Sequence, residues 1–363
     1  MLLGAAGLGA WLGEGEAGVR AALAHLGCVQ LDPIDRVGTN ADLVAGARAR
    51  GLARGDVHRH LRGRAFEHFA KERCLLEARF FPHYRDRAVE TPWWRHSERM
   101  KKLDAGLVAD VLAEVLARGP CTAEALADRG RVEAMDWAGW KGTSSATKLA
   151  LEVLWTRCEV VVSARDARGR HVYDVPARAL GAWADAPPEG GFGEEMLVAR
   201  VRAAGLLSRA GGPMWSMLGD VRTDGTVERL LEAGRLVEVR IGRRPYLMLP
   251  EPPPPPPDDG ALRVLGPLDS LLWDRALVRE AFGFDYVWEI YKPATTRAWG
   301  YYVCPLLHRG ALVGRLEGRR DGRTLVVETT WGSPEPDALA GALDRLAEAN
   351  GCDARVGPLR ALP

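Results

Sequence analysis

The stretch ATKLALEVLWTRCEVVVSARDARGRHVYDV, residues 146–175, predicts the fold of the middle of the chain. In its first part apolar side chains recur at helical spacing, which predicts a helix from Ala146 to about Arg157. Two β-rich runs follow over 159–163 and 171–175, and turn-forming residues separate them, as in a hairpin. A helix that leads into a hairpin is typical of the second half of a winged helix.

The residues before this stretch supply the missing helices of such a unit. An amphipathic helix is predicted over 107–116, and Gly119-Pro120 ends it. Thr122 is a helix-capping residue type, so a short second helix is expected from there to Asp128. Three helices followed by a hairpin predict a winged helix, a module that usually binds DNA through its third helix but also binds proteins.

The same pattern recurs and indicates an array of similar units. The later set comprises helices over 194–207, 214–218 and 227–233 and β runs over 236–241 and 245–249. A further unit is expected at the front, with a helix around Ala17 to Leu26 and others in the segment that follows. The middle of the chain therefore resembles a repeat of small domains more than one large enzyme fold.

Six consecutive prolines, Pro252 to Pro257, predict a stiff linker and a domain boundary. Short β runs follow at 286–291, 301–307, 311–316 and 324–330, and a helix is expected over 337–349. We predict an α+β fold of tandem winged-helix domains followed by a C-terminal β-barrel with a closing helix. The expected domains are 1–103, winged-helix-like and carrying the catalytic motif; 104–188 and 189–250, the second and third winged helices; and 258–363, the barrel.

Positive charge is concentrated in one window of a nearly neutral chain. The formal net charge is +1, yet residues 45–102 hold 15 Lys and Arg against seven Asp and Glu. This window carries +8, so the rest of the chain sums to −7. Such a concentration is expected of a phosphate-binding surface, and an Arg-rich solvated helix face is the alternative.

The composition excludes several other classes. With 47% hydrophobic and 27% charged residues, the chain has the balance of a globular protein. Six cysteines without a C-x-x-C pair predict free thiols in a reducing compartment. The apolar residues 1–12 are too few to span a membrane, so we expect a cytoplasmic protein without a membrane partner. His58 and His60 lack a third ligand at a typical spacing, and neither metal nor cofactor is expected.

The segment CVQLDP, residues 28–33, contains the candidate catalytic pair. In extended backbone alternate side chains share a face, so Gln30 and Asp32 are expected side by side, about 6.5 to 7 Å apart. An amide and a carboxylate at that separation can hold one water or flank one reacting atom. A structural interpretation stays open, in which Asp32 makes an Asx turn into Pro33 and Gln30 caps a backbone group.

Several segments along the chain match the motifs of one known family. The N-terminal matches are VQLDP at 29–33, AFEHFAKE at 65–72 and FPHYRDR at 81–87. The C-terminal matches are more specific: PLDSLLWDR at 267–275, FGFDYVWE at 282–289, Arg297, GYYV at 300–303 and LVGR at 312–315. These segments resemble those of the AlkZ/YcaQ-like winged-helix DNA glycosylases, and the resemblance extends over about residues 17 to 330. It implies three tandem winged helices and a C-terminal β-barrel.

The family's signature of Gln, an apolar residue, then Asp or Gln falls on Gln30, Leu31 and Asp32. The resemblance implies removal of cationic N7-alkylated purines from double-stranded DNA and unhooking of interstrand crosslinks built on them. Asp32 would stabilise an oxocarbenium-like sugar and act as base toward water, which Gln30 would orient. Because no lysine stands beside the motif in the sequence, a monofunctional glycosylase without a Schiff base is expected. We also expect the protein to act as a monomer.

Candidate DNA contacts come from the polar loop after the motif, from the third helix of the middle unit, and from basic and aromatic residues between two β runs. They are Arg36, Thr39, Asn40, Arg85, Arg87, Lys148, Lys292, Arg297, Trp299 and Tyr301. At Thr39-Asn40-Ala41-Asp42 the sequence departs from better-known members of the family, which carry Arg and His there. This departure bears on substrate range more than on reaction type.

Two other function classes stay open at this point. A non-enzymatic winged-helix regulator would bind one DNA sequence far better than random DNA, whereas a repair enzyme would respond to lesions. A protein-docking scaffold would bind its partner without a steep dependence on salt. Excision of N7-methylguanine from duplex DNA separates the glycosylase from both.

Overall fold

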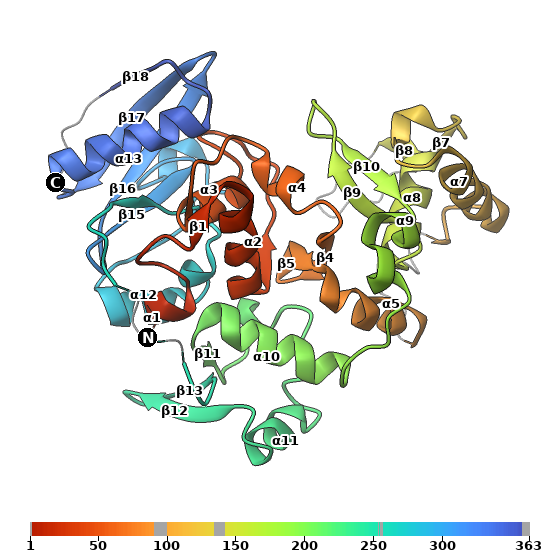
Figure 1. Ribbon diagram of the computed structural model, residues 1–363, viewed down its shortest axis with the longest axis horizontal. Helices are drawn as coiled ribbons and strands as arrows, with labels where there is room; N and C mark the ends of the chain where they lie inside the picture. Colours follow the sequence, from red (N-terminus) through yellow and green to blue (C-terminus); the bar gives the residue numbers. More distant parts are fainter. Residues whose placement is uncertain (1, 91–99, 134–141, 253, 255–256, 358–363) are drawn as a thin grey trace. The chain divides into compact units, whose positions relative to one another are not determined.

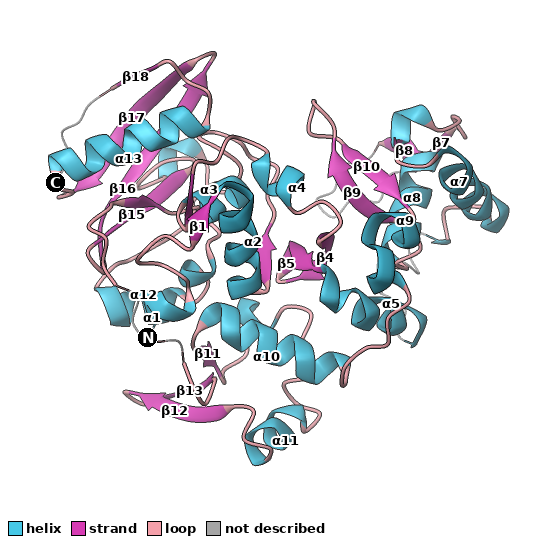
Figure 2. Cartoon of the chain, viewed as in Figure 1, coloured by secondary structure: helices cyan, strands magenta, loops and turns pink. Residues whose placement is uncertain are grey.

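The computed structural model describes residues 2–90, 100–133, 142–252, 254 and 257–357 as a mixture of helices and small sheets (Figures 1 and 2). Residues 253, 255 and 256 of the proline run, and 91–99 of the basic window, lie outside the described residues. The chain divides into two compact units. Unit 1 comprises Met1–His60, Phe69–Cys74 and Met196–Pro363, and unit 2 comprises Leu61–His68 and Leu75–Glu195.

Unit 2 contains the helix and hairpin that the opening stretch predicted. Helix α8 (Ala146–Thr156) begins after Ser145, whose hydroxyl accepts a hydrogen bond from the Lys148 N–H at 3.4 Å. Strands β9 (Val161–Arg165) and β10 (His171–Asp174) pair antiparallel, and β6 (Cys121–Thr122) adds a third strand in the order β6-β10-β9. The prediction from periodicity is confirmed for the helix and for the hairpin.

Other parts of unit 2 differ from the prediction. The first helix, α7 (Ala105–Arg118), is longer than expected. The second is only a 3-10 turn, η2 (Ala123–Ala125), because Leu126 adopts extended backbone and ends it. An unpredicted hairpin pairs β7 (Arg131–Glu133) with β8 (Thr143–Ser145). The remaining helices are η1 (Ala78–Phe80), α5 (Phe81–Glu90), α9 (Pro176–Leu180) and η3 (Gly181–Ala184).

The second predicted set is also present. Its helices are α10 (Phe192–Ala204), η4 (Pro213–Trp215) and α11 (Thr226–Glu232). Its strands are β11 (Leu207–Ser208), β12 (Val237–Ile241) and β13 (Arg244–Met248), in the order β11-β13-β12. The Gly242 backbone has φ 55°, which a glycine adopts without strain and which lets the β12–β13 hairpin turn tightly.

The front of the chain forms a third set. The helices are α1 (Leu2–Ala5), α2 (Gly15–Leu26), α3 (Asn40–Gly46) and α4 (Asp56–His60). The strands are β1 (Gly13–Glu14), β2 (Cys28–Gln30), β3 (Ala49–Arg50), β4 (Ala65–Ala70) and β5 (Glu72–Glu77). β1 pairs with β3, and the other three form a sheet of order β2-β5-β4.

One strand order thus occurs three times along the chain. In each small sheet the first strand lies beside the third, and the second strand lies at the far edge: β2-β5-β4, β6-β10-β9 and β11-β13-β12. Each first strand follows a helix of 12 to 14 residues, namely α2, α7 or α10. Helices then separate it from the hairpin, and in the second set β7 and β8 lie between them as well. The repeat that the sequence indicated is therefore a repeat of topology.

The C-terminal part of unit 1 is an open sheet, so the expected barrel is wrong for the described residues. Its strands are β14 (Arg263–Val264), β15 (Val303–His308), β16 (Ala311–Asp321), β17 (Thr324–Gly332) and β18 (Ala354–Val356), in chain order. β14 and β18 are opposite edges, and β18 runs parallel to β17 after the crossover helix α13 (Pro336–Ala349). Short helices η5 (Ser270–Leu272), α12 (Arg275–Phe282) and η6 (Ala294–Thr296) lie between β14 and β15.

The physical reason is that α13, rather than sheet closure, covers the apolar face (Figure 1). Leu339 and Leu343 of α13 are fully buried in one cluster with Leu316 and Leu325 of the sheet. Val37, from the loop after the candidate motif, is buried in the same cluster. The N-terminal loop and the C-terminal sheet therefore share a core, and this core holds the motif in place.

Candidate active site

Gln30 is the last residue of β2 and is only 7% exposed. Its side-chain Oε1 accepts a hydrogen bond from Lys71 Nζ at 3.1 Å, and its backbone carbonyl accepts one from Asn40 Nδ2 at 2.8 Å. The next residue, Leu31, donates its N–H to the Arg73 carbonyl at 2.8 Å. Side chain and backbone are thus both fixed, so the Gln30 amide is preorganised.

Asp32 lies in the loop after β2 with a half-buried side chain. Its Oδ1 accepts a hydrogen bond from the Ile34 N–H at 2.9 Å, so the Asx turn considered from the sequence is present. Burial raises the pKa of Asp32, and the bond from Ile34 offsets this only in part. Since Ile34 is the hydrogen-bond partner of Asp32 among the described residues, Oδ2 is left to act on a ligand. The structural role and a chemical role are therefore compatible.

Lys71 is the residue that sequence reasoning missed. It lies at the turn between β4 and β5, and is 41 positions from the amide that it binds. Its Nζ also lies 5.2 Å from the centroid of the Trp273 ring. Burial lowers the pKa of Lys71; the neighbouring Cys74 opposes this shift, and the positive charge of Arg200 adds to it. Its sequence signal was its place in the AFEHFAKE match at 65–72. Its contact with Gln30 depends on the order of the sheet, which is known only once the strands are paired.

Asn40 was predicted to contact DNA, but the structure gives it a different place. It is fully buried, and its Oδ1 accepts a hydrogen bond from the Leu268 N–H at 3.0 Å while its Nδ2 binds the Gln30 carbonyl. A Cβ atom at Gly266 would lie 2.5 Å from the same Oδ1, so glycine is required for this approach. Both ends of the amide are used, which makes Asn40 a bridge between β2 and residues 266–268.

The other polar residues of the loop bind one another. Thr39 caps α3, because its hydroxyl accepts a hydrogen bond from the Asp42 N–H at 3.2 Å and donates one to Asp42 Oδ2 at 2.9 Å. Burial raises the pKa of Asp42 as well, although the bonds from Thr39 and Gly55 oppose it. Arg36 pairs with Glu328 of β17 at 3.2 Å and keeps its side chain 32% exposed. Of the predicted contacts in this loop, Arg36 is the one best placed to reach a ligand.

Tyr302 lies close to the same loop, although sequence reasoning selected its neighbour Tyr301. Tyr302 is 1% exposed, and its hydroxyl has no hydrogen-bond partner among the described residues. Burial raises the pKa of Tyr302 well above its usual range, and the charges of Cys304, Asp32 and Asp42 raise it further. The buried hydroxyl therefore remains neutral beside the Asp32 carboxylate.

The C-terminal DNA candidates gather around one loop of unit 1. Lys292 binds Glu289 at 2.7 Å, and the Trp299 N–H donates to the same carboxylate at 2.7 Å. The Arg297 guanidinium lies 4.9 Å from the centroid of the Tyr301 ring. The structure thus brings together Lys292, Arg297, Trp299 and Tyr301, which the sequence only placed between two β runs.

The remaining candidates belong to unit 2. Arg85 donates to the carbonyls of Ala184 and Ala186 at 2.7 and 3.1 Å, so its guanidinium is largely used within the unit. Arg87 lies 4.3 Å from the centroid of the Phe192 ring. Lys148, at the start of α8, is 55% exposed and pairs with Glu124 at 2.8 Å. An exposed pair of this kind exchanges readily for a phosphate.

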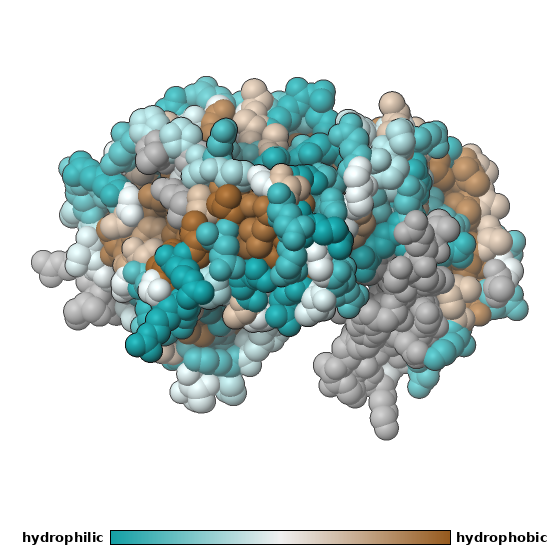
Figure 3. All heavy atoms as spheres, turned by 90° about the horizontal axis from the view of Figure 1, so that it is seen from below, coloured by the Kyte–Doolittle hydropathy of each residue, from teal (hydrophilic) through white to brown (hydrophobic). Residues whose placement is uncertain are grey.

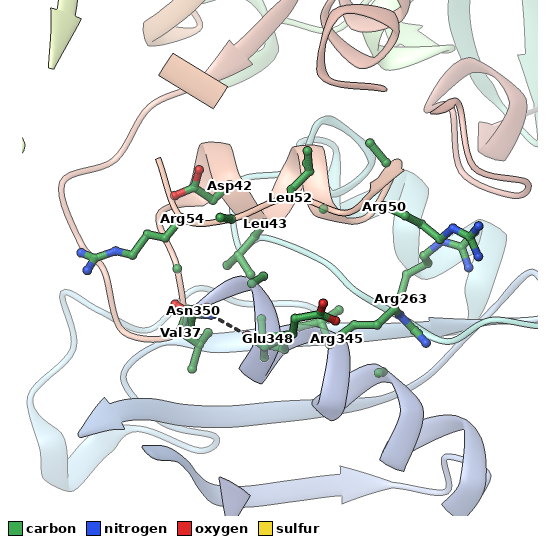
Figure 4. Close-up of a pocket in the computed structure, with 18 of the residues that line it drawn as sticks. Val37, Asp42, Leu43, Arg50, Leu52, Arg54, Arg263, Arg345, Glu348 and Asn350 are labelled. Atoms are coloured by element: carbon green, nitrogen blue, oxygen red, sulfur yellow. Dashed lines mark hydrogen bonds between the residues drawn. The ribbon is translucent and has the colours of Figure 1, made fainter. Parts of the chain in front are cut away.

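A cavity of about 260 Å³ lies between the N-terminal loop and α13 (Figure 4). Asp42 and Leu43 line it from α3, whereas Arg345 and Glu348 line it from α13. Gln30 and Asp32 are not among its lining residues. The lining residues Arg50, Arg54 and Arg263 pair with carboxylates outside the lining, namely Glu14, Asp35 and Asp259. Because these charges are already paired and the candidate pair lies elsewhere, we do not place the reaction there.

The described residues form neither a metal-binding cluster nor a membrane-spanning helix. Across the described ranges, no group of three or more His, Cys, Asp and Glu side chains lies close enough together to hold a metal ion. In the same ranges, every helix is too short or too polar to cross a bilayer. The cysteines Cys28, Cys74, Cys121, Cys158, Cys304 and Cys352 are free, as the sequence indicated.

Comparisons with known proteins agree with this architecture. The family model described as "DNA glycosylase AlkZ-like" matches residues 23–349. The solved structure of Streptomyces sahachiroi DNA glycosylase AlkZ is similar over 93% of this chain and 93% of that chain, with a TM-score of 0.56 and 17% sequence identity. At this identity the structural likeness shows a shared fold, whereas the family match covers both the candidate pair and strands β14 to β17 of the C-terminal sheet.

Proposed function

This chain belongs to the AlkZ-like family of DNA glycosylases, and from that premise we propose that it hydrolyses the N-glycosidic bond of cationic N7-alkylated purines in double-stranded DNA. We extend the proposal to unhooking of interstrand crosslinks built on such purines, by a monomer without a cofactor. The observation that carries it is the half-buried Asp32 carboxylate, two residues after the fixed amide of Gln30.

The chemistry of the substrate suits this pair. A purine alkylated at N7 is positively charged, so it leaves as a neutral base and needs little help from an acid. The enzyme must instead stabilise the positive charge that develops on the sugar and supply a water. A carboxylate about 4 Å from that charge, at an effective dielectric constant near 20, contributes about 4 kcal/mol. This is roughly a thousandfold in rate.

Lys71 supports a specific arrangement of the water. Because Lys71 Nζ occupies Gln30 Oε1, the amide offers its N–H groups rather than its oxygen to the site. A water that accepts a hydrogen bond from Gln30 keeps its protons directed toward Asp32. We therefore assign the base role to Asp32, the orienting role to Gln30, and a positioning role to Lys71.

No lysine stands beside the motif in the sequence, but Lys71 lies beside it in space. We still propose a monofunctional reaction, because Nζ is held between Gln30 and the Trp273 ring. The test incubates the protein with duplex DNA that contains one N7-methylguanine. We expect free base and an unbroken abasic strand, with no adduct trapped by borohydride. Absence of base release contradicts the glycosylase, and a trapped adduct that Lys71→Arg abolishes contradicts the monofunctional reaction.

We propose that DNA is bound by the three repeated sets of helices and strands, which contain the sheets β2-β5-β4, β6-β10-β9 and β11-β13-β12. Their shared strand order, with a helix before the first strand and a hairpin after the short helices, supports their identity as winged helices. Lys148 lies at the N-terminal end of α8, the helix that such a unit places in a groove. Arg36, Arg85, Arg87, Lys148, Lys292 and Arg297 are the proposed phosphate contacts, with Trp299 and Tyr301 beside them. We propose Thr39 for a supporting role in the loop.

Replacing Lys71 by Met should lower the single-turnover excision rate by about a hundredfold, because a misdirected Gln30 amide no longer holds the water. Lys71→Arg keeps a donor and should recover much of the loss, which a purely structural role would not produce. The matched control is Lys102→Met, since Lys102 pairs with Glu133 on the surface of unit 2. Equal rates for Lys71→Met and the control would remove Lys71 from the mechanism.

The excision rate should depend on a carboxylate whose pKa is raised by burial. Asp32 acts only when ionised, so the rate should be full above its pKa and fall as the pH drops through it. The fall should begin above about pH 4, the ordinary range of an aspartate. The measurement is the single-turnover rate against pH, corrected for spontaneous depurination. A profile that stays level through pH 5 to 4 argues against Asp32 as the base.

A further inference from the structure

The loop from Glu289 to Gly300 presents an aromatic side chain to solvent without covering it. Within the described ranges, three large hydrophobic side chains are exposed: Leu116 at 51%, Trp183 at 43% and Tyr291 at 88%. The face drawn in Figure 3 shows hydrophobic areas bordered by hydrophilic residues. Tyr291 stands out because nearly its whole ring is exposed.

The loop that carries Tyr291 is fixed from inside. Glu289 is 2% exposed, and its carboxylate accepts hydrogen bonds from Lys292 Nζ at 2.7 Å, the Ala298 N–H at 3.2 Å and the Trp299 N–H at 2.7 Å. Burial alone would raise the pKa of Glu289, but the bonds from Lys292 and the backbone outweigh it and lower the pKa to about 2. The carboxylate is therefore ionised throughout the working pH range and holds both arms of the loop.

Further contacts set the direction of the ring and the charge around it. The Trp288 ring meets Tyr291 edge-on, with centroids 5.9 Å apart and an angle of 77°. The Arg297 Nε donates a hydrogen bond to the Lys292 carbonyl at 3.0 Å, so the Arg297 side chain lies against the Lys292 backbone. Lys292 keeps its side chain 46% exposed. The exposed ring is thus followed in the loop by two basic residues whose backbone and side chain are in contact.

This combination matches the chemistry of DNA more closely than that of a protein partner. Cations close to an exposed ring can bind phosphates of a strand while the ring stacks on one of its bases. A protein interface centred on an aromatic residue is usually surrounded by apolar neighbours in a desolvated patch. Here the neighbours on the loop are Lys292, Pro293 and the exposed residues 294–296.

We propose that Tyr291 inserts into the base stack of the DNA beside the lesion and stacks on a neighbouring base, with Lys292 and Arg297 on the flanking phosphates. This inference rests on the proposed function, since it concerns how that function recognises its substrate. Insertion is easiest where a base is already lost or poorly stacked, so Tyr291 should favour damaged over intact duplex. The same stacking would keep the protein bound to the abasic product after the base has left.

The test compares Tyr291→Ala, Tyr291→Trp and the control Trp183→Ala. Trp183 is an exposed aromatic residue of unit 2, whereas Tyr291 belongs to unit 1. The probe is a duplex with a stable abasic analogue next to 2-aminopurine, titrated with each protein. For Tyr291→Ala we expect a loss of affinity on the order of tenfold to a hundredfold. We also expect loss of the change in 2-aminopurine fluorescence that wild type causes on binding. Tyr291→Trp should preserve both, and Trp183→Ala should behave as wild type.

The inference is overturned if Tyr291→Ala binds with wild-type affinity and changes the 2-aminopurine fluorescence as wild type does. In that case a protein partner would be the better explanation of the exposed ring. This failure is distinguishable from failure of the proposed function. If wild type releases no base but Tyr291→Ala still weakens binding to the abasic duplex, the stacking inference stands and the substrate proposal fails. If wild type releases base and Tyr291→Ala binds and quenches normally, only the stacking inference fails.

Discussion

Asp32→Asn should excise N7-methylguanine about a thousandfold more slowly than wild type while binding the same duplex with unchanged affinity. The substitution removes the negative charge that opposes the developing sugar cation, and about 4 kcal/mol of electrostatic stabilisation is lost with it. The amide of Asn can still accept the hydrogen bond from the Ile34 N–H, so the Asx turn and the fold are kept. Single-turnover rates and a parallel binding titration measure the two quantities separately.

Asp42→Asn is the matched control for this experiment. Asp42 lies in the next helix, is also partly buried, and also has a pKa raised by burial. Its carboxylate is occupied by Thr39 and Gly55 instead of facing a free site. We expect Asp42→Asn to retain nearly the wild-type rate. If both variants lose the same activity, the effect reflects the charge balance of the loop and not catalysis by Asp32.

Local sequence patterns predicted the elements of this fold well. The helical spacing in residues 146–157 and the two β runs after it correspond to α8, β9 and β10, because amphipathic periodicity reports which face is buried. The alternation likewise placed Gln30 on a buried strand, of which it is the last residue, whereas Asp32 lies in the loop that follows. That the two side chains lie side by side stays a prediction. Both of the roles considered for Asp32 could be named from the segment itself, since an Asx turn is a local structure.

Features that depend on distant pairing could not be predicted. Lys71 reaches Gln30 only because β5 lies next to β2, an order that no local period specifies. Asn40 looked like a ligand-binding residue because a polar side chain in a polar loop is usually exposed, yet its partner Leu268 is 228 positions away. Strand periodicity predicted the C-terminal strands but not whether their edges meet, and α13 covers the face that closure would have enclosed.

Replacing Asp269 by Ala should destabilise unit 1 by about 3 to 5 kcal/mol, the usual effect of removing one partner of a buried ion pair. Arg48 and Asp269 are both fully buried and bind in a bidentate arrangement at 2.7 and 3.0 Å. Arg48 also donates to the carbonyls of Ala6 and Val44, so after the substitution its charge stays buried without a counterion. The free energy of unfolding in urea measures the loss.

Two further variants separate the ion pair from simple loss of side-chain contacts. The double variant Arg48→Met, Asp269→Leu removes both charges and should be more stable than Asp269→Ala, because no charge is left buried alone. Glu14→Ala removes the exposed partner of Arg50 and should cost less than about 1 kcal/mol. A loss for Asp269→Ala no larger than that of Glu14→Ala would mean that water reaches Arg48 and that the pair is not buried in solution.

The same variant connects stability to the site. Asp269 follows Leu268, whose N–H donates a hydrogen bond to Asn40, and Asn40 in turn donates one to the Gln30 carbonyl. Asp269 Oδ1 also accepts a hydrogen bond from the Leu271 N–H at 3.1 Å and so caps the start of η5. In protein that remains folded, Asp269→Ala should therefore lower the excision rate as well, since Gln30 loses part of its support. A conservative Asp269→Asn should recover the η5 cap but not the ion pair, so it should unfold nearly as easily while excising faster than Asp269→Ala.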